Sequence, residues 1–161
     1  MAQEKLTQAI IENSQSKKWD LARLEWDVVN FQDSEHPQEC TCGHFPIREI
    51  CTIQNRLTGK DLDVGNHCVK KFMGINSDKL FTSYKKVSKN SSASFNPEVI
   101  NLAHRAHLIN DWENTFYIDI WRKKSLTPKQ EEKKEQVNAK ILLAVRTGRW
   151  ASAVKPVQSV S

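Results

Sequence analysis

The sequence predicts an α+β fold, with a small β-hairpin module flanked by helices and followed by a helical C-terminal part. Apolar residues repeat with helical spacing before residue 31 and again after residue 95. Residues 46–64 are instead rich in β-branched side chains on either side of a glycine turn. Hydrophobic residues make up 39% and charged residues 27% of the 161-residue chain, which is typical of a globular protein.

We expect the first domain to cover residues 1–88, beginning with a short helix over 5–12 and a polar break at 13–18. A second helix is predicted over 19–31, because four apolar residues fall at i, i+3, i+7 and i+8. These are Leu21, Leu24, Val28 and Val29, with Trp19, Ala22 and Trp26 as an adjoining stripe. The segment DSEHPQE then indicates a turn.

A β-hairpin is predicted over residues 46–64, with Gly59 in its turn. Ile47, Cys51 and Ile53 share one side of its first strand. A helix then opens in GNHCVKKFM with Asn66 as its cap, and a further short helix is capped near Ser77.

The polar residues 89–95 read as a linker to a helical subdomain over 96–150, and 151–161 as a flexible tail. Asn96 before Pro97 predicts one helix start, and Thr127 with Pro128 and Gln130 predicts a capping box. Two sets of apolar residues mark the buried faces of the later helices. They are Ile109, Trp112, Phe116 and Ile120, followed by Val137, Ile141, Ala144 and Val145 up to a stop at Gly148.

The cysteines follow the order expected of a zinc site: a Cys-rich turn, a hairpin, then a helix start. Zinc takes four thiolate or imidazole ligands in a tetrahedron, and we predict a structural Zn²⁺ on Cys40, Cys42, His44 and Cys68. Two alternatives to His44 stay open. Cys51 is the first, although its mid-strand position favours a core role, and His67 is the second.

The run CTCGHFPIREICTIQNRLTGKDLDVGNHCVKKF, with Glu25–Trp26 upstream, resembles a module of small, mostly uncharacterised phage, prophage and mobile-element proteins. The shared pattern is a Cys pair with Gly and often His, then I-x-N-x-x-T-G and V-G-x-x-C followed by Phe. Its positions here are Cys40, Cys42, Gly43, His44, Ile53, Asn55, Thr58, Gly59, Val64, Gly65, Cys68 and Phe72. The chain departs from the pattern in its shortened C-x-C pair. The resemblance covers residues 20–88, extends loosely over 110–142, and implies a zinc-stabilised module without an assigned activity.

The sequence contains no familiar catalytic motif, so we expect a non-enzymatic accessory protein; a zinc- or cysteine-dependent hydrolase is the alternative. Nucleic-acid binding is favoured because residues 40–94 carry nine basic against four acidic side chains. The expected contacts are Arg48, Arg56, Lys60, Lys70, Lys71, Lys85 and Lys86. Basic residues beside Trp121 and Trp150 could add base stacking.

The alternative function is a protein-interaction factor that modulates host transcription, replication or defence machinery. Its docking face would be the acidic N-terminal segment with Trp19, Trp26 and Phe31. We expect a cytoplasmic protein, in the host cell if phage-encoded, with neither a membrane partner nor a small-molecule substrate. The basis is that no apolar run reaches the roughly 18 residues of a membrane span, and clustered cysteines suit a reducing compartment.

Overall fold

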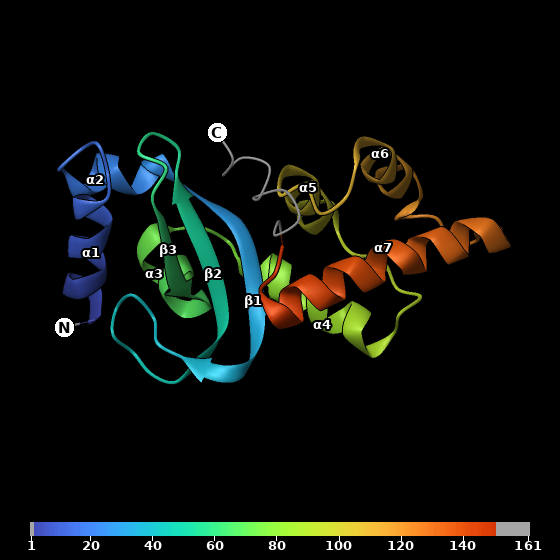
Figure 1. Cartoon of the computed structure of the whole chain (residues 1–161), viewed down its shortest axis with the longest axis horizontal. Helices are drawn as coiled ribbons and strands as arrows, with labels where there is room; N and C mark the ends of the chain where they lie inside the picture. Colours follow the sequence, from blue (N-terminus) through green and yellow to red (C-terminus); the bar gives the residue numbers. More distant parts are fainter. Residues whose placement is uncertain (1, 151–161) are drawn as a thin grey trace, which may run out of the picture. The chain divides into compact units, whose positions relative to one another are not determined.

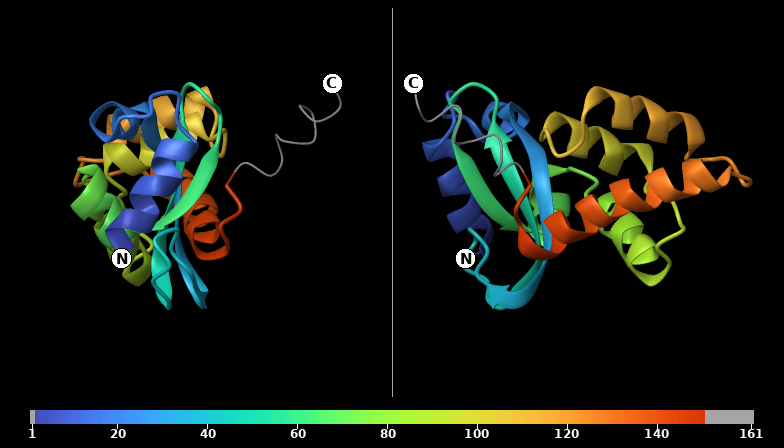
Figure 2. Two further views of the ribbon diagram at one scale, coloured as in Figure 1. Left: turned by 90° about the vertical axis from the view of Figure 1, so that its left-hand side faces the viewer. Right: turned by 45° about the vertical axis from the view of Figure 1, so that its right-hand side comes forward.

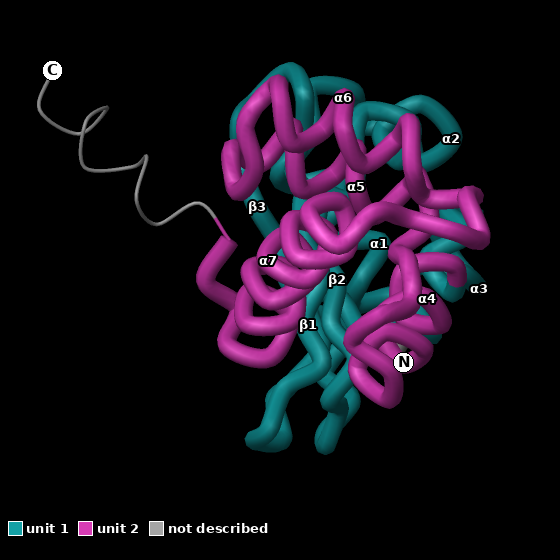
Figure 3. Tube along the Cα trace, turned by 90° about the vertical axis from the view of Figure 1, so that its right-hand side faces the viewer, with its two compact units in different colours: residues 1–78 teal, residues 79–161 magenta. Residues whose placement is uncertain are grey.

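The computed structural model describes residues 2–150 of the chain (Figure 1). The chain divides into two compact units, residues 1–78 and 79–161, which Figure 3 colours separately. Residues 89–95, where a linker was expected, lie within the second unit. The tail predicted at 151–161 lies outside the described residues.

Unit 1 is built around a three-stranded antiparallel sheet in the order β1-β2-β3. The strands are β1 (Trp26–Gln38), β2 (Ile47–Asn55) and β3 (Asp61–Gly65). β2 and β3 form the predicted hairpin, with Cys51 opposite Val64 and Ile53 opposite Leu62. The predicted α+β fold class is therefore confirmed: a hairpin module with helices before and after it.

The predicted helix over residues 19–31 is wrong. Only a short α2 (Trp19–Ala22) and the 3₁₀ turn η1 (Arg23–Glu25) form, and the chain then enters β1, which runs along β2 in both views of Figure 2. Leu21 and Leu24, counted as core in the helical pattern, are 56% and 57% exposed. Val28 instead pairs with Ile53, because a β-branched residue packs well on a pleated sheet when a partner strand is available. The segment DSEHPQE, expected to be a turn, is mostly the second half of β1.

The end of α1 (Ala2–Glu12) is tied to the sheet by buried polar side chains. The Trp26 indole donates a hydrogen bond to Ser14 Oγ at 2.8 Å, and Asn55 Nδ2 donates to Glu25 Oε1 at 2.9 Å. Glu25 also accepts hydrogen bonds from the backbone N–H groups of Gln15 and Ser16. These bonds satisfy a carboxylate that is 7% exposed, so three separate segments meet at one point.

α3 (Asn66–Met73) packs against β2 and β3 and buries Val69 and Met73. Its N-cap is Gly65, not Asn66. The Asn66 side chain is used elsewhere: its amide donates to Glu49 and Asp78, and its oxygen accepts a hydrogen bond from the Ser77 hydroxyl. Asn66 therefore fastens the start of α3 to the neighbouring segments.

Unit 2 is helical throughout its described part, with helix starts where the sequence predicts them. Asn96 caps α5 by accepting from the Val99 N–H, and Thr127 caps α7 through a complete capping box with Gln130. α7 ends at Gly148, whose φ of 76° suits a residue without a side chain. The helices are α4 (Asp78–Lys89), α5 (Pro97–Arg105), α6 (Asp111–Ile120) and α7 (Pro128–Thr147).

The buried face of α6 differs from the prediction. Trp112 is 60% exposed, whereas Glu113 and Tyr117 are buried with Ile120. The Tyr117 hydroxyl accepts from the Phe95 N–H at 2.8 Å and donates to Asn138 Oδ1 at 2.6 Å. The core of unit 2 thus contains a polar network between α6, α7 and the segment before α5, which an apolar periodicity could not reveal.

Candidate metal centre

Cys40 and Cys42 lie on the tight turn between β1 and β2. The Gly43 N–H donates to Cys40 O at 2.8 Å, and the Cys40 N–H donates to His44 O at 3.0 Å. Gly43 has a φ of 93°, which lets the chain reverse without steric strain. This closed turn brings the two thiols to the same side although only one residue separates them.

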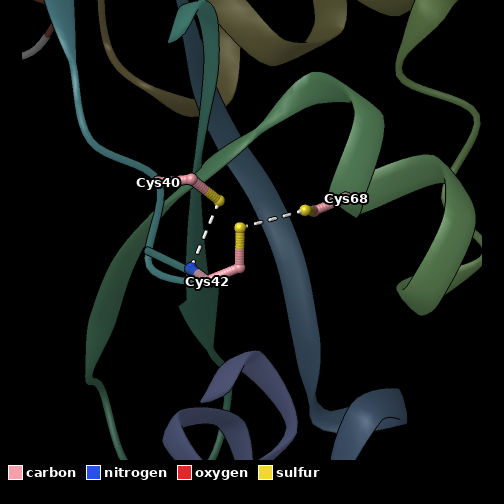
Figure 4. Close-up of side chains that lie close together, drawn as sticks. All are labelled: Cys40, Cys42 and Cys68. Carbon is pink, nitrogen blue, oxygen red and sulfur yellow. Dashed lines mark hydrogen bonds between the residues drawn. The ribbon is translucent and has the colours of Figure 1, made fainter. Parts of the chain in front are cut away.

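Cys68 joins these two cysteines from the first turn of α3. The three sulfur atoms lie within 4.8 Å of one another, and all three residues are buried (Figure 4). The Cys68 and Cys42 sulfur atoms are 3.5 Å apart. The described residues contain no other cluster of this kind, and three close thiols could hold a metal ion.

Two backbone N–H groups point at the Cys40 sulfur. The Gly65 N–H donates to it at 3.2 Å and the Cys42 N–H at 3.4 Å. Such donors stabilise a thiolate without occupying a ligand position. A Cβ on Gly65 would lie 3.7 Å from that sulfur and 3.4 Å from the Ile47 methyl group, which is ordinary van der Waals contact, so the position contributes through its N–H.

Burial and hydrogen bonding have opposite effects on the three thiols. Burial raises the pKa values of Cys40 and Cys68, since a desolvated thiolate is unfavourable. Burial also acts on Cys42, but hydrogen bonds from the His44 N–H and the two neighbouring thiols outweigh it and lower its pKa. Cys42 is therefore the thiol best prepared to give up its proton first.

Cys51 lies apart from the cluster, in the core between Phe31 on β1 and Val64 on β3. It is fully buried, and burial raises its pKa to about 12. The core role predicted for Cys51 fits this position, because its sulfur is not among the close group formed by Cys40, Cys42 and Cys68.

His44 and His67 are both exposed and are not part of the group of close ligand atoms. Both nevertheless line a pocket of about 720 Å³ that the three cysteines also line. Its other charged lining residues are Arg48, Glu49 and Lys71. Both histidines therefore share one pocket with the three cysteines, and His44 as fourth ligand stays a prediction.

Gly65 is a site residue that the sequence analysis named only as part of a motif. Its N–H is aimed at Cys40, twenty-five residues away in the chain. The V-G-x-x-C spacing could have indicated this role, because it places a glycine at the start of a helix, three residues before the third cysteine.

The basic residues predicted to bind nucleic acid are divided between the two units. Arg48, Arg56, Lys60, Lys70 and Lys71 belong to unit 1, whereas Lys85 and Lys86 belong to unit 2. Arg48 donates to the Ser34 and Glu35 carbonyl oxygens, Arg56 pairs with Asp27 at 3.1 Å, and Lys70 pairs with Asp78 at 2.9 Å. Several of these cations therefore already have partners within unit 1.

Charge is distributed very unequally between the units. Residues 1–78 carry nine basic and twelve acidic side chains, a net charge of −3. Residues 79–161 carry fifteen basic and seven acidic side chains, a net charge of +8. The basic excess of the chain thus belongs to unit 2, whereas the cysteine cluster belongs to unit 1.

Fold and site together define a small α+β protein with a candidate metal centre formed by three cysteines. Comparisons with protein-family models, with curated proteins and with solved structures found no match. The resemblance to the mobile-element module therefore stays a prediction. No helix among the described residues is both long and apolar enough to cross a membrane.

Proposed function

We propose that the protein is a non-enzymatic accessory factor whose zinc-stabilised unit 1 accompanies a nucleic-acid-binding unit 2. The metal role is carried by the three buried sulfur atoms within 4.8 Å of one another. The nucleic-acid role is supported by the net charge of +8 on residues 79–161. In this proposal the protein acts in a reducing cytoplasm, in a host cell if the phage resemblance holds.

Zinc fits the donor set because it favours thiolate and imidazole ligands in a closed tetrahedron at structural sites. Cys40, Cys42 and Cys68 would supply three ligands, and His44 or His67 the fourth from the pocket rim. The metal would contribute folding free energy to a unit whose sheet has only three strands. Its role here is to join the β1–β2 turn to α3.

Metal analysis of the full chain, purified without chelators, tests the centre. We expect one zinc per chain, lost in Cys68→Ser and retained in Cys51→Ala, the matched control for a buried cysteine outside the cluster. Cobalt substitution should give an intense sulfur-to-metal absorption band in the parent protein. Stoichiometric zinc in Cys68→Ser would contradict the assignment.

The fourth ligand can be identified with the same cobalt signal. Replacing the liganding histidine with alanine should shift the ligand-field bands, whereas replacing the other histidine should leave them unchanged. A shift in His67→Ala alone would move the assignment from His44 to His67.

Nucleic-acid binding is tested by fluorescence anisotropy with labelled oligonucleotides over a range of salt concentrations. We expect affinity to fall linearly on a log–log plot as salt rises, because each phosphate contact releases a counterion. An affinity that does not depend on salt, or an absence of binding at low salt, would refute this part of the proposal.

A protein-docking function is the second candidate, favoured by three exposed leucines of unit 1: Leu21, Leu24 and Leu57. The aromatic face predicted for docking is mostly unsuitable, since Trp26 and Phe31 are buried in the core. Binding through the leucines would be apolar and nearly insensitive to salt, and Leu24→Ser should abolish it.

A further inference from the structure

Trp112 is an exposed tryptophan that the packing of unit 2 does not use. It lies on α6, whose buried residues are Glu113, Tyr117 and Ile120, and the Trp112 residue is 60% exposed. Its ring stacks on that of Phe116, one helical turn further on, with centroids 5.2 Å apart and planes within 4° of parallel. The two parallel rings form an aromatic stack on α6, in which the Trp112 side chain remains largely exposed.

A lysine accompanies this aromatic pair. Lys133 of α7 places its Nζ 5.5 Å from the Trp112 ring centroid, and the same atom lies 3.4 Å from the Glu113 carboxylate. Lys140 holds that carboxylate more closely, at 2.8 Å. Glu113 therefore keeps Lys140 as a partner when Lys133 turns toward another anion. Lys133 is thus available to bind a ligand at Trp112.

The helix that carries Lys133 continues the positive charge. Lys129 lies one helical turn before Lys133 and is exposed. Arg122, Lys123 and Lys124 follow the end of α6, and Arg122 lies over the Trp121 ring at 5.3 Å. An aromatic stack with cations on α7 and in the α6–α7 connection matches a ligand that has flat bases and a phosphate backbone.

We propose that the Trp112–Phe116 pair is a stacking platform for an unpaired nucleobase, so that unit 2 prefers single-stranded nucleic acid to duplex. This inference rests on the nucleic-acid binding proposed above. Bases within a duplex are already stacked on their neighbours and offer only edges, whereas single strands expose the faces that aromatic side chains bind. Lys133 would neutralise the phosphate next to the stacked base.

The test compares the affinity of the full chain for a labelled single strand and for a duplex of the same sequence. Trp112→Ala should weaken single-strand binding about 5- to 150-fold, the range typical of losing one stacked base, and change duplex binding less than threefold. Trp112→Phe keeps an aromatic ring and should retain most of the affinity. Leu143→Ala, a substitution of another exposed apolar residue of unit 2, is the matched control and should have no effect.

Lys133→Gln supplies an independent measurement. It should reduce the salt slope for the single strand by about 0.7, the value of one phosphate contact, while leaving the preference for single strands in place. Circular dichroism should show unchanged helix content in each variant, since Trp112 and Lys133 lie outside the core.

The outcomes separate the two proposals. If the parent protein binds neither the single strand nor the duplex, the proposed nucleic-acid function is refuted and the stacking platform with it. If the parent binds single strands and Trp112→Ala binds them equally well, only the platform is overturned. A protein contact that is lost in Trp112→Ala while nucleic-acid affinity is unchanged would likewise overturn the platform and assign Trp112 to protein docking.

Discussion

Each unit buries a glutamate, and the two units satisfy it differently. Glu25 in unit 1 accepts hydrogen bonds from two backbone N–H groups and the Asn55 amide. Glu113 in unit 2 is paired with two lysine ammonium groups and the Asn110 N–H. The first arrangement fixes the backbone of distant segments, whereas the second neutralises charge between two regular helices.

The contrast extends to the way each unit is held together. Unit 1 has irregular connections that meet at Glu25 and at the cysteine cluster, so a few points of contact between distant segments hold its shape. Unit 2 consists of helices whose starts are encoded locally by Asn96, Asn110 and Thr127. We therefore expect the stability of unit 1 to depend on the proposed zinc and the stability of unit 2 to be independent of it.

Removing the metal should produce the largest difference in stability between the two units. A chelator should unfold unit 1, because structural zinc contributes about 10–16 kcal/mol in small zinc domains, which matches or exceeds the ~5–15 kcal/mol stability of a typical domain. Hydrogen exchange measured by mass spectrometry should show loss of protection in residues 26–73 and retained protection in 97–147. Equal loss of protection in both ranges would show that the stability of both units depends on the metal.

Tyr117→Phe should destabilise unit 2 selectively by about 1–3 kcal/mol, because Asn138 and the Phe95 N–H lose a buried hydrogen-bond partner. Burial raises the Tyr117 pKa to about 12, so the hydroxyl remains a hydrogen-bond donor well above neutral pH. Urea unfolding monitored by circular dichroism measures the loss, and the zinc content should stay at the parental value. A drop in zinc content would show coupling between the units.

Acid should remove the stabilising contribution of Glu113. Burial raises its pKa, but the hydrogen bond from Lys140, the Asn110 N–H and the interaction with Lys133 outweigh burial and lower the pKa below its ordinary value of 4.5. The stabilisation is therefore present above pH 4.5 and is lost as pH falls through the folded-state pKa. Glu113→Gln should make the stability of unit 2 less dependent on pH below 4.5.

The stability of Glu25→Gln, measured over the same pH range, provides the comparison in unit 1. The Asn55 hydrogen bond outweighs burial and, with the Ser16 and Gln15 N–H groups, lowers the Glu25 pKa. Added salt should reduce the effect of Glu113→Gln, which removes pairing with lysines, and leave that of Glu25→Gln nearly unchanged. An equal response to salt would remove the contrast between the two carboxylates.

Of these substitutions, Asp27→Asn should change the stability of the protein least. Asp27 and Arg56 pair at 3.1 Å, but both side chains are more than half exposed, and such pairs contribute about 0–1 kcal/mol. Arg56 also keeps its hydrogen bond to Leu24 O. Thermal unfolding should therefore change little, and a larger loss would show that this corner of unit 1 depends on charge.

The features predicted correctly from the sequence are those with a local signal. The glycine turn of the hairpin, the Asn96–Pro97 start and the Thr127 capping box each depend on residues within a few positions. The order of Cys40, Cys42 and Cys68 around the hairpin likewise indicated the cluster, because the hairpin returns the chain to its own beginning.

The features that could not be predicted depend on partners far along the chain. Val28 belongs to a strand only because Ile53 is available opposite it, and the local apolar spacing fitted a helix equally well. Trp112 was placed in the core by periodicity, while the burial of Glu113 requires lysines from another helix. His44 lies just beyond the reversal at Gly43, where its exposure depends on how the turn closes.

The hydrogen bonds around Asn55 set a lower limit on the size of a fragment of unit 1 that could fold by itself. Its side-chain oxygen accepts hydrogen bonds from the Leu57 and Thr58 N–H groups of the hairpin turn, and its nitrogen donates to Glu25. Thr58 in turn donates its hydroxyl to Asn13 O. A truncated fragment that begins after residue 14 would keep every cysteine but lose Asn13 and Ser14, which bind Thr58, Trp26 and Asn55, so a minimal version must retain the N-terminal helix.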